Sequence, residues 1–494
     1  MRTGRRVLLA GALGTLPARA QGAPGTDAAP ARPRYAVQRA EEDWGALRDP
    51  ALRGAWWDRI KYLPLGGAPN DTALPPAYLT LGGDARLYPE RYTWEDFGDG
   101  TPQSDGYVLQ RYMLHGDLRV ATAAPLGGRL FAQIKSGLVA GRRGPGRPPD
   151  VDTLDVHQLF VEGRVRHGGG DPPALALRVG RQEFFYGSAR LLHFREGPNV
   201  RQSFDAARAI GRARGWRADA FVASPAPTNP GAFDDGLDGT RRLWGVYASG
   251  PLRAATPAAA PHADAYYIGH RRRRARFDQG TAREVRHTLG TRLWGRVAAG
   301  AGRRVDYNWE PMVQLGTFGT GDAAGRIRAW TLATETAVSW PAARLAPRLS
   351  LRADVASGDR DPADPDLETF HPLYPKGNYF GLLSPVGPAN FRDLHPQAEL
   401  TLWRGAVLTA DWLYLWRHSP RDGTYNVVGA LFRGAAGSRA RFVGHQPGAQ
   451  VEWEADAHTT LLVNYAVFFA GPYVRETGPA RNISYLAAYA AYRF

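Results

Sequence analysis

Apolar and polar residues alternate along most of the chain from Tyr78 to its end at Phe494. In residues 79–88, for example, Leu81 and Leu87 stand on one face of a β-strand and Asp84 lies on the other. A period of two is that of a strand with one apolar and one polar side. Several of these runs reach the ~9–11 residues that a tilted strand needs to cross a membrane. The pattern therefore favours membrane-spanning strands over the shorter strands of a soluble sandwich.

The alternation predicts 18 strands, an even number that suits a bacterial barrel. Their expected ranges are 79–88, 107–121, 128–139, 153–166, 174–185, 205–214, 215–224, 242–250, 264–272, 286–299, 303–317, 326–340, 346–357, 395–404, 407–418, 448–456, 458–470 and 482–494. The connections support the count, because long and short ones alternate. The long ones, expected outside the cell, are 89–106, 186–204, 358–394 and 419–447, and the short ones include 300–302, 341–345 and 405–406. The turn over 251–263 is longer than expected.

The fold class that follows is all-β: a transmembrane antiparallel β-barrel with long extracellular loops and short periplasmic turns. Aromatic residues stand near strand ends on the apolar faces, as in the girdles of such barrels, for example at Trp330, Trp340, Trp412 and Trp416. The terminal Phe494 on an alternating strand is typical of proteins sorted to the outer membrane. We expect a monomer with both termini in the periplasm.

The first 20 residues predict an export signal. Arg5 and Arg6 precede a short apolar run, and Ala18 and Ala20 form a small-x-small cleavage site. Residues 21–77 form the expected periplasmic N-terminal segment, and 78–494 the barrel. Within that segment, residues 42–65 carry a Trp-rich amphipathic pattern and should pack on the main body, with docking to a partner as the alternative.

Charge and composition narrow the chemistry. The chain has no Cys, which excludes disulfides and thiolate metal sites. It carries a net charge of +15, and all its basic residues are Arg except Lys61, Lys135 and Lys376. The export signal argues against a nucleic-acid partner. The run Arg271-Arg272-Arg273-Arg274 is expected in an outer loop, in contact with lipopolysaccharide phosphates.

Residues opposite in parity to the apolar face should line the lumen. In the first ten strands the expected inward bases are Arg86, Arg111, Arg119, Lys135, Arg164, Arg178, Arg217, Arg286, Arg292 and Arg296, against the acids Asp84, Asp117, Glu162 and Asp219. In the last eight strands the expected acids are Asp306, Glu310, Glu335, Asp354, Glu399, Asp411, Glu452 and Glu454, with Arg352 as their basic companion. This predicts a basic wall facing an acidic wall. The alternative is that these groups neutralise one another and stabilise the barrel.

Two loop clusters are candidate sites at the mouth. The first surrounds the third outer loop and comprises Arg181, Glu183, Arg190, Arg195, Asp205 and Arg208. It could bind sugar carboxylates or form a network that stabilises the loop. The second is the stretch 359–394, which suits a packed loop or lid. Its acids Asp359, Asp361, Asp364 and Asp366, with Arg360, could bind Ca²⁺, but a solvated acidic loop is the preferred interpretation, so no metal or cofactor is assigned.

Three blocks carry a resemblance to a known family. They are VGRQEFFYGSARLLHFREGPNVRQSFDAARAIGR at 179–212, DVASGDRDP followed by FHPLYPKGNYFGLLSPVGPANFRDLHP within 354–396, and LRDPALRGAWWDRIKYLPLGG followed by YLTLGG within 47–83. Together they resemble the alginate-export family of outer-membrane barrels, from about Leu47 to Phe494. The resemblance implies an 18-stranded barrel that secretes an acidic exopolysaccharide.

Three functions remain in competition. The leading hypothesis is passive export of an anionic, alginate-like polysaccharide. The second is an uptake porin, general or substrate-specific, for small anions. The third, a barrel hydrolase, finds no support: there is no G-x-S-x-G motif, and His157, His193, His371 and His395 are scattered. Expected partners are the polymer, outer-membrane lipid and lipopolysaccharide, the barrel-assembly machinery and a periplasmic scaffold of a synthesis-secretion complex.

Overall fold

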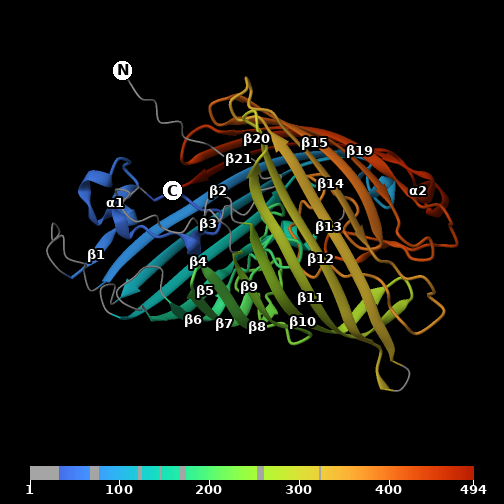
Figure 1. Ribbon diagram of the computed structural model, residues 1–494, viewed down its shortest axis with the longest axis horizontal. Helices are drawn as coiled ribbons and strands as arrows, with labels where there is room; N and C mark the ends of the chain where they lie inside the picture. Colours follow the sequence, from blue (N-terminus) through green and yellow to red (C-terminus); the bar gives the residue numbers. More distant parts are fainter. Residues whose placement is uncertain are drawn as a thin grey trace.

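The computed structural model describes residues 33–66, 77–120, 125–144, 146–165, 174–252, 261–321 and 324–494. These residues form an antiparallel β-barrel of 18 strands (Figure 1). The strands are β2 (Ala77–Thr93), β3 (Ser104–Val120), β4 (Leu126–Ala140), β5 (Asp152–Val165), β6 (Leu175–Gln182), β7 (Phe204–Ala213), β8 (Trp216–Pro225), β9 (Arg241–Pro251), β10 (His262–Phe277), β11 (Gly280–Ala298), β12 (Arg304–Phe318), β13 (Gly325–Ser339), β14 (Arg348–Ala356), β15 (Phe391–Trp403), β16 (Ala406–Trp416), β19 (Phe442–Glu454), β20 (Thr459–Ala470) and β21 (Ile483–Arg493). The predicted fold class is confirmed. The predicted export signal lies outside the described residues.

The barrel closes where its first and last strands pair. Asp84 of β2 lies opposite Arg493 of β21, and the pairing continues to Thr93 opposite Ser484. Beyond the end of β21, the short strand β1 (Leu63–Leu65) lies beside β2 and pairs with Ala77–Leu79. Consecutive strands pair antiparallel around the rest of the wall.

The two faces of the wall match the alternation in the sequence. On the outside, Leu87 is 48% exposed and Leu114 is 53% exposed, as lipid-facing side chains are in the absence of lipid. On the inside, Arg111 is only 3% exposed. The aromatic residues of the predicted girdles also face outward, with Trp330 42% and Trp412 44% exposed.

The two ends of the barrel differ in their connections. Strands β7 and β8, and β15 and β16, are joined by two-residue turns at the end that holds Phe494, which we assign to the periplasm. The longest connections, 183–203, 357–390 and 417–441, lie at the opposite end. One prediction there is wrong: Arg271-Arg272-Arg273-Arg274 lies within β10, not in a loop, because β10 and β11 continue to a tight turn at Asp278 and Gln279.

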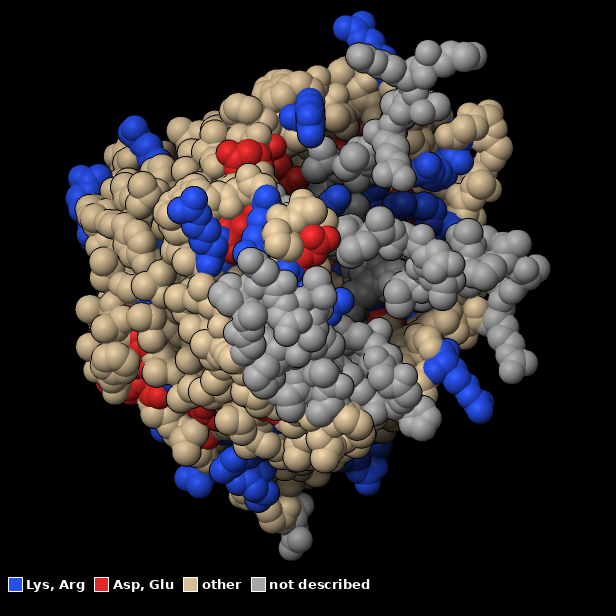
Figure 2. All heavy atoms as spheres, turned by 90° about the vertical axis from the view of Figure 1, so that its left-hand side faces the viewer, with Lys and Arg blue, Asp and Glu red and all other residues tan. Residues whose placement is uncertain are grey.

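The N-terminal segment caps the periplasmic end of the barrel. It contains the 3₁₀ turns η1 (Arg39–Glu41), η2 (Gly45–Arg48) and η3 (Pro50–Leu52) and the helix α1 (Asp58–Lys61). Figure 1 shows it beside β1, β2 and the C-terminus. Its Trp44 and Leu47 are buried with Tyr62 and Tyr78 in a small apolar core. Figure 2 views this end directly and shows basic side chains around the rim, with acidic ones between them.

Polar contacts fix the segment inside the end of the barrel. The Arg39 guanidinium donates to the carbonyl oxygens of Gly83 and Phe494, at 2.9 and 2.8 Å. Lys61 Nζ donates to the carbonyl of Leu81 at 2.8 Å. A Cβ atom at Gly82 would lie 2.3 Å from Lys61 Nζ and 2.8 Å from the Phe494 carbonyl oxygen. Glycine at this position is therefore what allows the segment, the wall and the C-terminus to meet.

Two outer loops, 183–203 and 357–390, fold into the lumen and join each other. The N–H of His193 donates to the carbonyl of Tyr374, and the N–H of Tyr374 donates to that of Leu191. The main-chain N–H of Lys376 donates to the carbonyl of Ala189 at 2.9 Å. Because the loops share hydrogen bonds, they form one narrowing across the barrel.

Smaller elements close the outer half around an apolar and aromatic core. They are η4 (Glu95–Gly98), η5 (Pro148–Asp150), the hairpin β17 (Thr424–Tyr425) with β18 (Leu431–Arg433), and α2 (Pro472–Thr477). Phe97, Phe370, Tyr425, Phe468 and Tyr473 are among the buried residues of that core. Among the described residues, no helix has both the length and the apolar character to cross a membrane.

Candidate functional site

An open cavity of about 710 Å³ lies inside the barrel against strands β11 to β14. Its wall is formed by inward side chains of those strands, and the two infolded loops contribute Arg190 and Lys376. A second cavity of about 470 Å³ lies against β14, β15, β16, β19 and β20. Arg352 and Lys376 line both cavities. These two residues therefore stand where the two spaces meet, at the narrowing that the loops create.

Five cationic side chains converge on the first cavity: Arg190, Arg292, Arg348, Arg352 and Lys376. Each of the four arginines pairs with at least one protein carboxylate, and one of these carboxylates is shared. Glu335 lies 3.1 Å from an Arg348 nitrogen and 3.6 Å from an Arg352 nitrogen. A guanidinium whose partner is shared keeps N–H groups for a further anion. The cavity therefore presents several cationic donors to whatever passes through it.

Lys376 has an unusual charge environment. Burial, together with the positive charges of Arg352 and Arg190, lowers the pKa of Lys376 from its ordinary value of 10.5 to about 7. Glu335 and Asp354 oppose this shift without cancelling it. The side chain therefore gains or loses its charge near neutral pH.

The second cavity is polar and less charged. His395 Nε2 lies 2.5 Å from Asp411 Oδ2, and neutral side chains such as Gln397, Gln446 and Asn464 line the rest. Amides and hydroxyls of this kind bind sugar hydroxyl groups by donating and accepting hydrogen bonds.

On the opposite side of the lumen, the predicted basic residues face inward but contact the infolded segments. Arg86 donates to the carbonyls of Glu196 and Pro198, and Arg111 Nη2 lies 2.5 Å from Glu196 Oε1. Although burial opposes the shift, Arg111, Arg201 and Arg86 lower the pKa of Glu196 strongly. The interior against β2 and β3 is therefore occupied by loop 183–203 rather than open.

The N-terminal segment occupies the periplasmic half of the same side. Arg119 donates to the carbonyl of Glu42 at 2.5 Å and pairs with Asp117 at 3.1 Å. Arg178 pairs with Glu41 and Glu162. Burial opposes ionisation of Glu41, but Arg178 and other cations lower its pKa to about 2. For these arginines the neutralising interpretation describes the observed contacts, and their role in transport stays a prediction.

The remaining predicted lumen residues also face inward. Arg217 pairs with Asp219, Arg286 with Glu284, Arg292 with Asp264 and Arg296 with Asp306, and Arg164 lies near Glu162. Glu399 pairs with Arg348, Glu310 with Arg190, and Asp354 with Arg190. Glu452 is buried, and Glu454 is partly exposed near the periplasmic end of β19.

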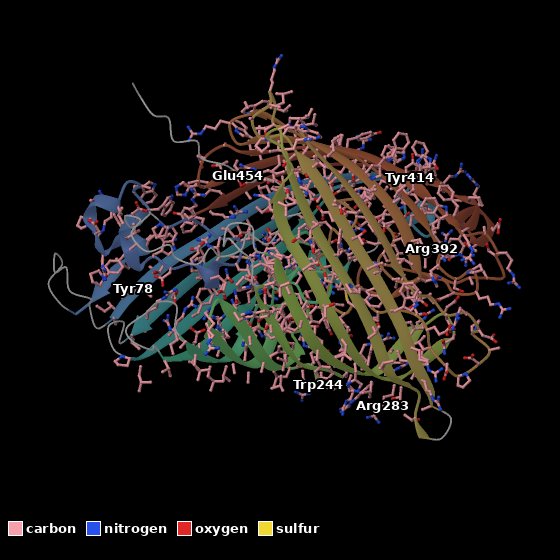
Figure 3. The ribbon with its side chains drawn as sticks, in the orientation of Figure 1. Tyr78, Trp244, Arg283, Arg392, Tyr414 and Glu454 are labelled. Atoms are coloured by element: carbon pink, nitrogen blue, oxygen red, sulfur yellow. The ribbon has the colours of Figure 1, made fainter. Side chains whose placement is uncertain are left out.

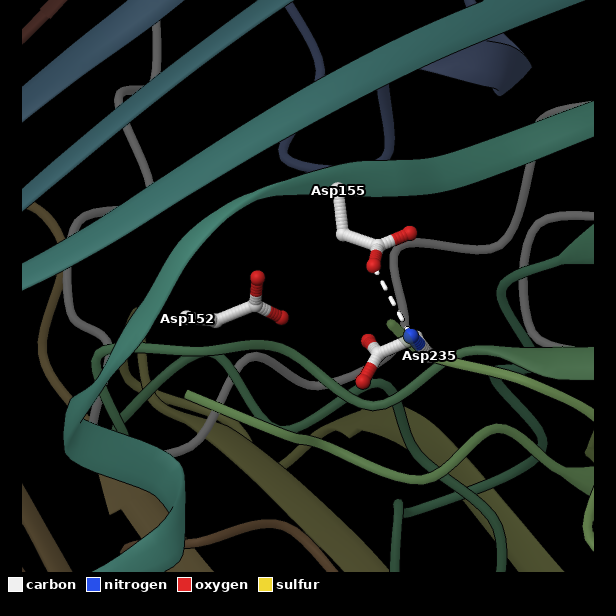
Figure 4. A group of neighbouring side chains, drawn as sticks. All are labelled: Asp152, Asp155 and Asp235. Carbon is white, nitrogen blue, oxygen red and sulfur yellow. Dashed lines mark hydrogen bonds between the residues drawn. The ribbon is translucent and has the colours of Figure 1, made fainter. Parts of the chain in front are cut away.

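Three of the described acids could in principle hold a metal ion, and Figure 4 shows their carboxylates converging. They are Asp152, Asp155 and Asp235. Lys135 Nζ lies 2.6 Å from Asp152 and 2.8 Å from Asp235, so an ammonium group already contacts two of them. Asp155 accepts the main-chain N–H of Asp235 at 2.9 Å. The cluster anchors loop 226–240 to the wall.

The predicted separation into a basic and an acidic wall is wrong in two respects. The first ten strands carry further inward acids, among them Glu90, Asp264 and Glu284. The acidic side gains cations that the prediction did not include: Arg348, which shares the parity of Arg352 on β14, and, from the loops, Arg190 and Lys376. The densest cationic group that lines a cavity therefore lies on the side predicted to be acidic.

The predicted mouth cluster is a network of pairs. Arg181 pairs with Asp205 at 2.9 Å, Glu183 contacts His157 and Arg201, and Arg208 pairs with Asp219. Arg195 donates to the carbonyl of Pro375, which ties the two loops together. Arg190 lines the cavity, and in this it differs from the others.

The acidic stretch of the second loop is only partly solvated. Asp359 is 3% exposed, and burial together with Asp422 raises its pKa to about 7. Asp361 and Asp364 are exposed.

Comparison with known proteins agrees with this architecture. The family model described as alginate export matches residues 77–486. The chain belongs to the alginate-export family. No curated protein matches the sequence significantly. A BenF-like porin from Pseudomonas fluorescens Pf-5 has a similar structure, with a TM-score of 0.57, 10% identity and coverage of 84% of this chain and 98% of that chain.

Two structures from Pseudomonas aeruginosa are similarly related. OccK2 (OpdF), in complex with glucuronate, gives a TM-score of 0.55 at 11% identity over 84% of this chain and 96% of its own. OpdK with vanillate gives 0.56 at 11% over 84% and 98%. At this identity the likeness shows the fold alone. Family and fold together are those of channels of the bacterial outer membrane.

Proposed function

We propose that this alginate-export family member is a passive export channel for an anionic, alginate-like exopolysaccharide and catalyses no reaction. The observation that carries the proposal is the cationic group that lines the first cavity and extends to its junction with the second. Arg190, Arg292, Arg348 and Arg352 provide permanently charged, forked donors that suit carboxylates. Lys376 adds a charge that can be switched near neutral pH.

The arrangement suits conduction better than tight binding. Each of the four arginines also contacts a protein carboxylate, such as Glu335, Glu399 or Asp264, so a carboxylate of the polymer must compete for it. Movement through a channel requires entry to be favourable and exit to be easy. A row of shared cations meets both conditions, because a bound carboxylate can pass from one guanidinium to the next.

The lining of the two cavities suits a sugar chain that carries carboxylates. The neutral lining of the second cavity, with Gln397, Gln446 and Asn464, would contact hydroxyl groups while the cationic group contacts carboxylates.

The test is block of single-channel current by oligouronates of increasing length in planar bilayers. We expect blocking events whose dwell time grows with chain length, and no block by neutral oligosaccharides of equal length. The triple variant Arg348→Ala, Arg352→Ala, Lys376→Met should reduce the block about tenfold. The matched control, Arg111→Ala, Arg119→Ala, Arg178→Ala, should reduce it less, and heat-modifiable gel mobility checks that both variants fold. Equal block of the wild type by neutral and acidic oligomers would contradict the proposal.

Uptake of small anions is the alternative, and a specific observation favours it. The infolded loops narrow the lumen, and similar barrels were solved with glucuronate and with vanillate. In that case the dwell time of current block should be the same for monomeric and oligomeric uronates, with no dependence on oligomer length. Radiolabelled uronate flux into proteoliposomes would then exceed polymer flux.

A further inference from the structure

The outer surface of the wall carries a dense group of arginines that the pathway does not use. They face away from the lumen at the extracellular ends of four strands, β9, β10, β11 and β13. We call this group the arginine surface: Arg242, Arg271, Arg273, Arg274, Arg276, Arg283, Arg326 and Arg328. Figure 3 shows Arg283 and Trp244 on the outside of this part of the wall.

The register brings like charges together. Arg242 of β9 and Arg271 of β10 are direct cross-strand partners. A bulge between Arg272 and Ala275 sets Arg273 and Arg274 against Arg283 of β11. Like charges directly opposite one another on a sheet destabilise it. A compensating anion would therefore stabilise this part of the wall.

No described carboxylate supplies that charge through an ion pair. The neighbours of opposite parity do have partners: Arg272 pairs with Glu284 at 2.5 Å and Arg241 with Asp238 at 2.7 Å. The arginine surface forms none with the described residues, since Asp366 accepts only the main-chain N–H of Arg326 there. The unmatched charge is thus specific to the outward face.

The height of the arginines on the wall indicates what could neutralise them. On β13, Trp330 stands two residues below Arg328, and on β9, Trp244 stands two residues below Arg242. Two residues correspond to about 7 Å along a strand. Aromatic girdles mark the boundary of the apolar core of the membrane. The arginines therefore lie just beyond that boundary, at the level of lipid headgroups in the outer leaflet.

We propose that the arginine surface binds the phosphate groups of a phosphorylated glycolipid of the outer leaflet, the chemistry that lipopolysaccharide presents. Guanidinium groups bind phosphate through paired, charge-assisted hydrogen bonds. A lipid is favoured over a soluble phosphate because the surface adjoins the lipid-facing band and not the lumen. Binding at this site is independent of what the channel transports.

The experiment measures binding of bisphosphorylated lipid A to the detergent-solubilised full-length protein by native mass spectrometry. The test variant is Arg274→Ser, Arg283→Ser, Arg328→Ser. The control variant, Arg303→Ser, Arg344→Ser, Arg404→Ser, removes three exposed arginines from periplasmic turns and changes the charge equally. We expect at least tenfold weaker binding in the test variant and little change in the control. Heat-modifiable gel mobility confirms that both variants fold.

Binding measurements with other ligands identify the chemical group that the arginine surface recognises. Dephosphorylated lipid A should bind at least tenfold more weakly than the phosphorylated form, and inorganic phosphate at equal concentration should not displace it. Phosphatidylglycerol should bind more weakly than lipid A, because it offers a single phosphate. Equal binding by test and control variants, by the dephosphorylated lipid, or by phosphatidylglycerol would overturn the proposal, as would displacement by inorganic phosphate.

Discussion

Arg190 of the first infolded loop lies 2.6 Å from Asp354 on strand β14, and this ion pair joins the loop to the far wall of the barrel. The pair is buried, and the Tyr379 hydroxyl also donates to Asp354 at 2.8 Å. A residue of the second loop thus completes the contact. The narrowing of the lumen depends on side chains from three separate parts of the chain.

Removing this contact should widen the channel. We expect Arg190→Ala to raise single-channel conductance, because breaking a buried ion pair costs about 3–5 kcal/mol and leaves Asp354 without its cationic partner. Arg181→Ala, which breaks the pair with Asp205 between β6 and β7, is the matched control and should leave conductance near the wild-type value. Unchanged conductance in Arg190→Ala would mean that the loop is held without this pair.

Anion selectivity should depend on pH through Lys376. Its pKa of about 7 predicts that selectivity for anions, measured as a reversal potential, falls as the pH rises from 6 to 8. Lys376→Arg should keep the anion preference across this range, and Lys376→Met should lower it at every pH. A wild-type reversal potential that does not change with pH would contradict the assignment.

The same shift has a consequence for stability. The ordinary pKa of 10.5 applies to the unfolded chain, which therefore binds more protons than the folded barrel between pH 7 and 10.5. The free energy of unfolding should rise with pH across this window. Lys376→Met should remove that part of the slope in urea titrations.

The N-terminal segment should restrict the channel and stabilise the barrel. Deleting residues 33–62 from the mature chain removes the carbonyl acceptors of Arg119 and Arg129 and the ion pair of Glu41 with Arg178. We expect higher conductance together with a lower unfolding temperature. Trp56→Ala, a change at a 66% exposed side chain of the same segment, should alter neither.

Deletion of Phe494 should impair insertion into the outer membrane. Its ring stacks on Trp57 with centroids 4.4 Å apart, and its carbonyl accepts from Arg39 and from the N–H of Gly83. The amount of heat-modifiable protein in outer-membrane fractions measures the effect. Phe494→Tyr keeps the ring and the carbonyl and should insert normally. Normal insertion of the truncated chain would show that the terminal residue is dispensable.

The wall of the barrel could be predicted from the sequence because each strand carries its own signal. Alternation along residues 205–214 was sufficient to predict β7, which runs from Phe204 to Ala213. The lengths of the connections indicated the orientation. The alternation also carries the signal for Arg348, which shares the parity of Arg352 on β14.

The interior could not be predicted in the same way. Parity shows that Arg111 faces inward, but its partner Glu196 lies in a loop whose path is decided by tertiary contacts. Lys376 lies in a Pro- and Gly-rich stretch without any period, so nothing local places it between the two cavities. The prediction of a loop at residues 271–274 failed for another reason. The β10–β11 hairpin continues beyond the membrane to a tight turn, and a charged run in such a hairpin resembles a loop in the sequence.

The Arg39 guanidinium bridges the line along which the barrel closes, since Gly83 belongs to β2 and Phe494 follows β21. Both acceptors come together only after the first and last strands have paired. The two hydrogen bonds of Arg39 therefore form at the end of assembly and resist lateral opening of the closed wall. Loss of these bonds should appear as a faster rate of unfolding, with little change in the rate at which the strands insert.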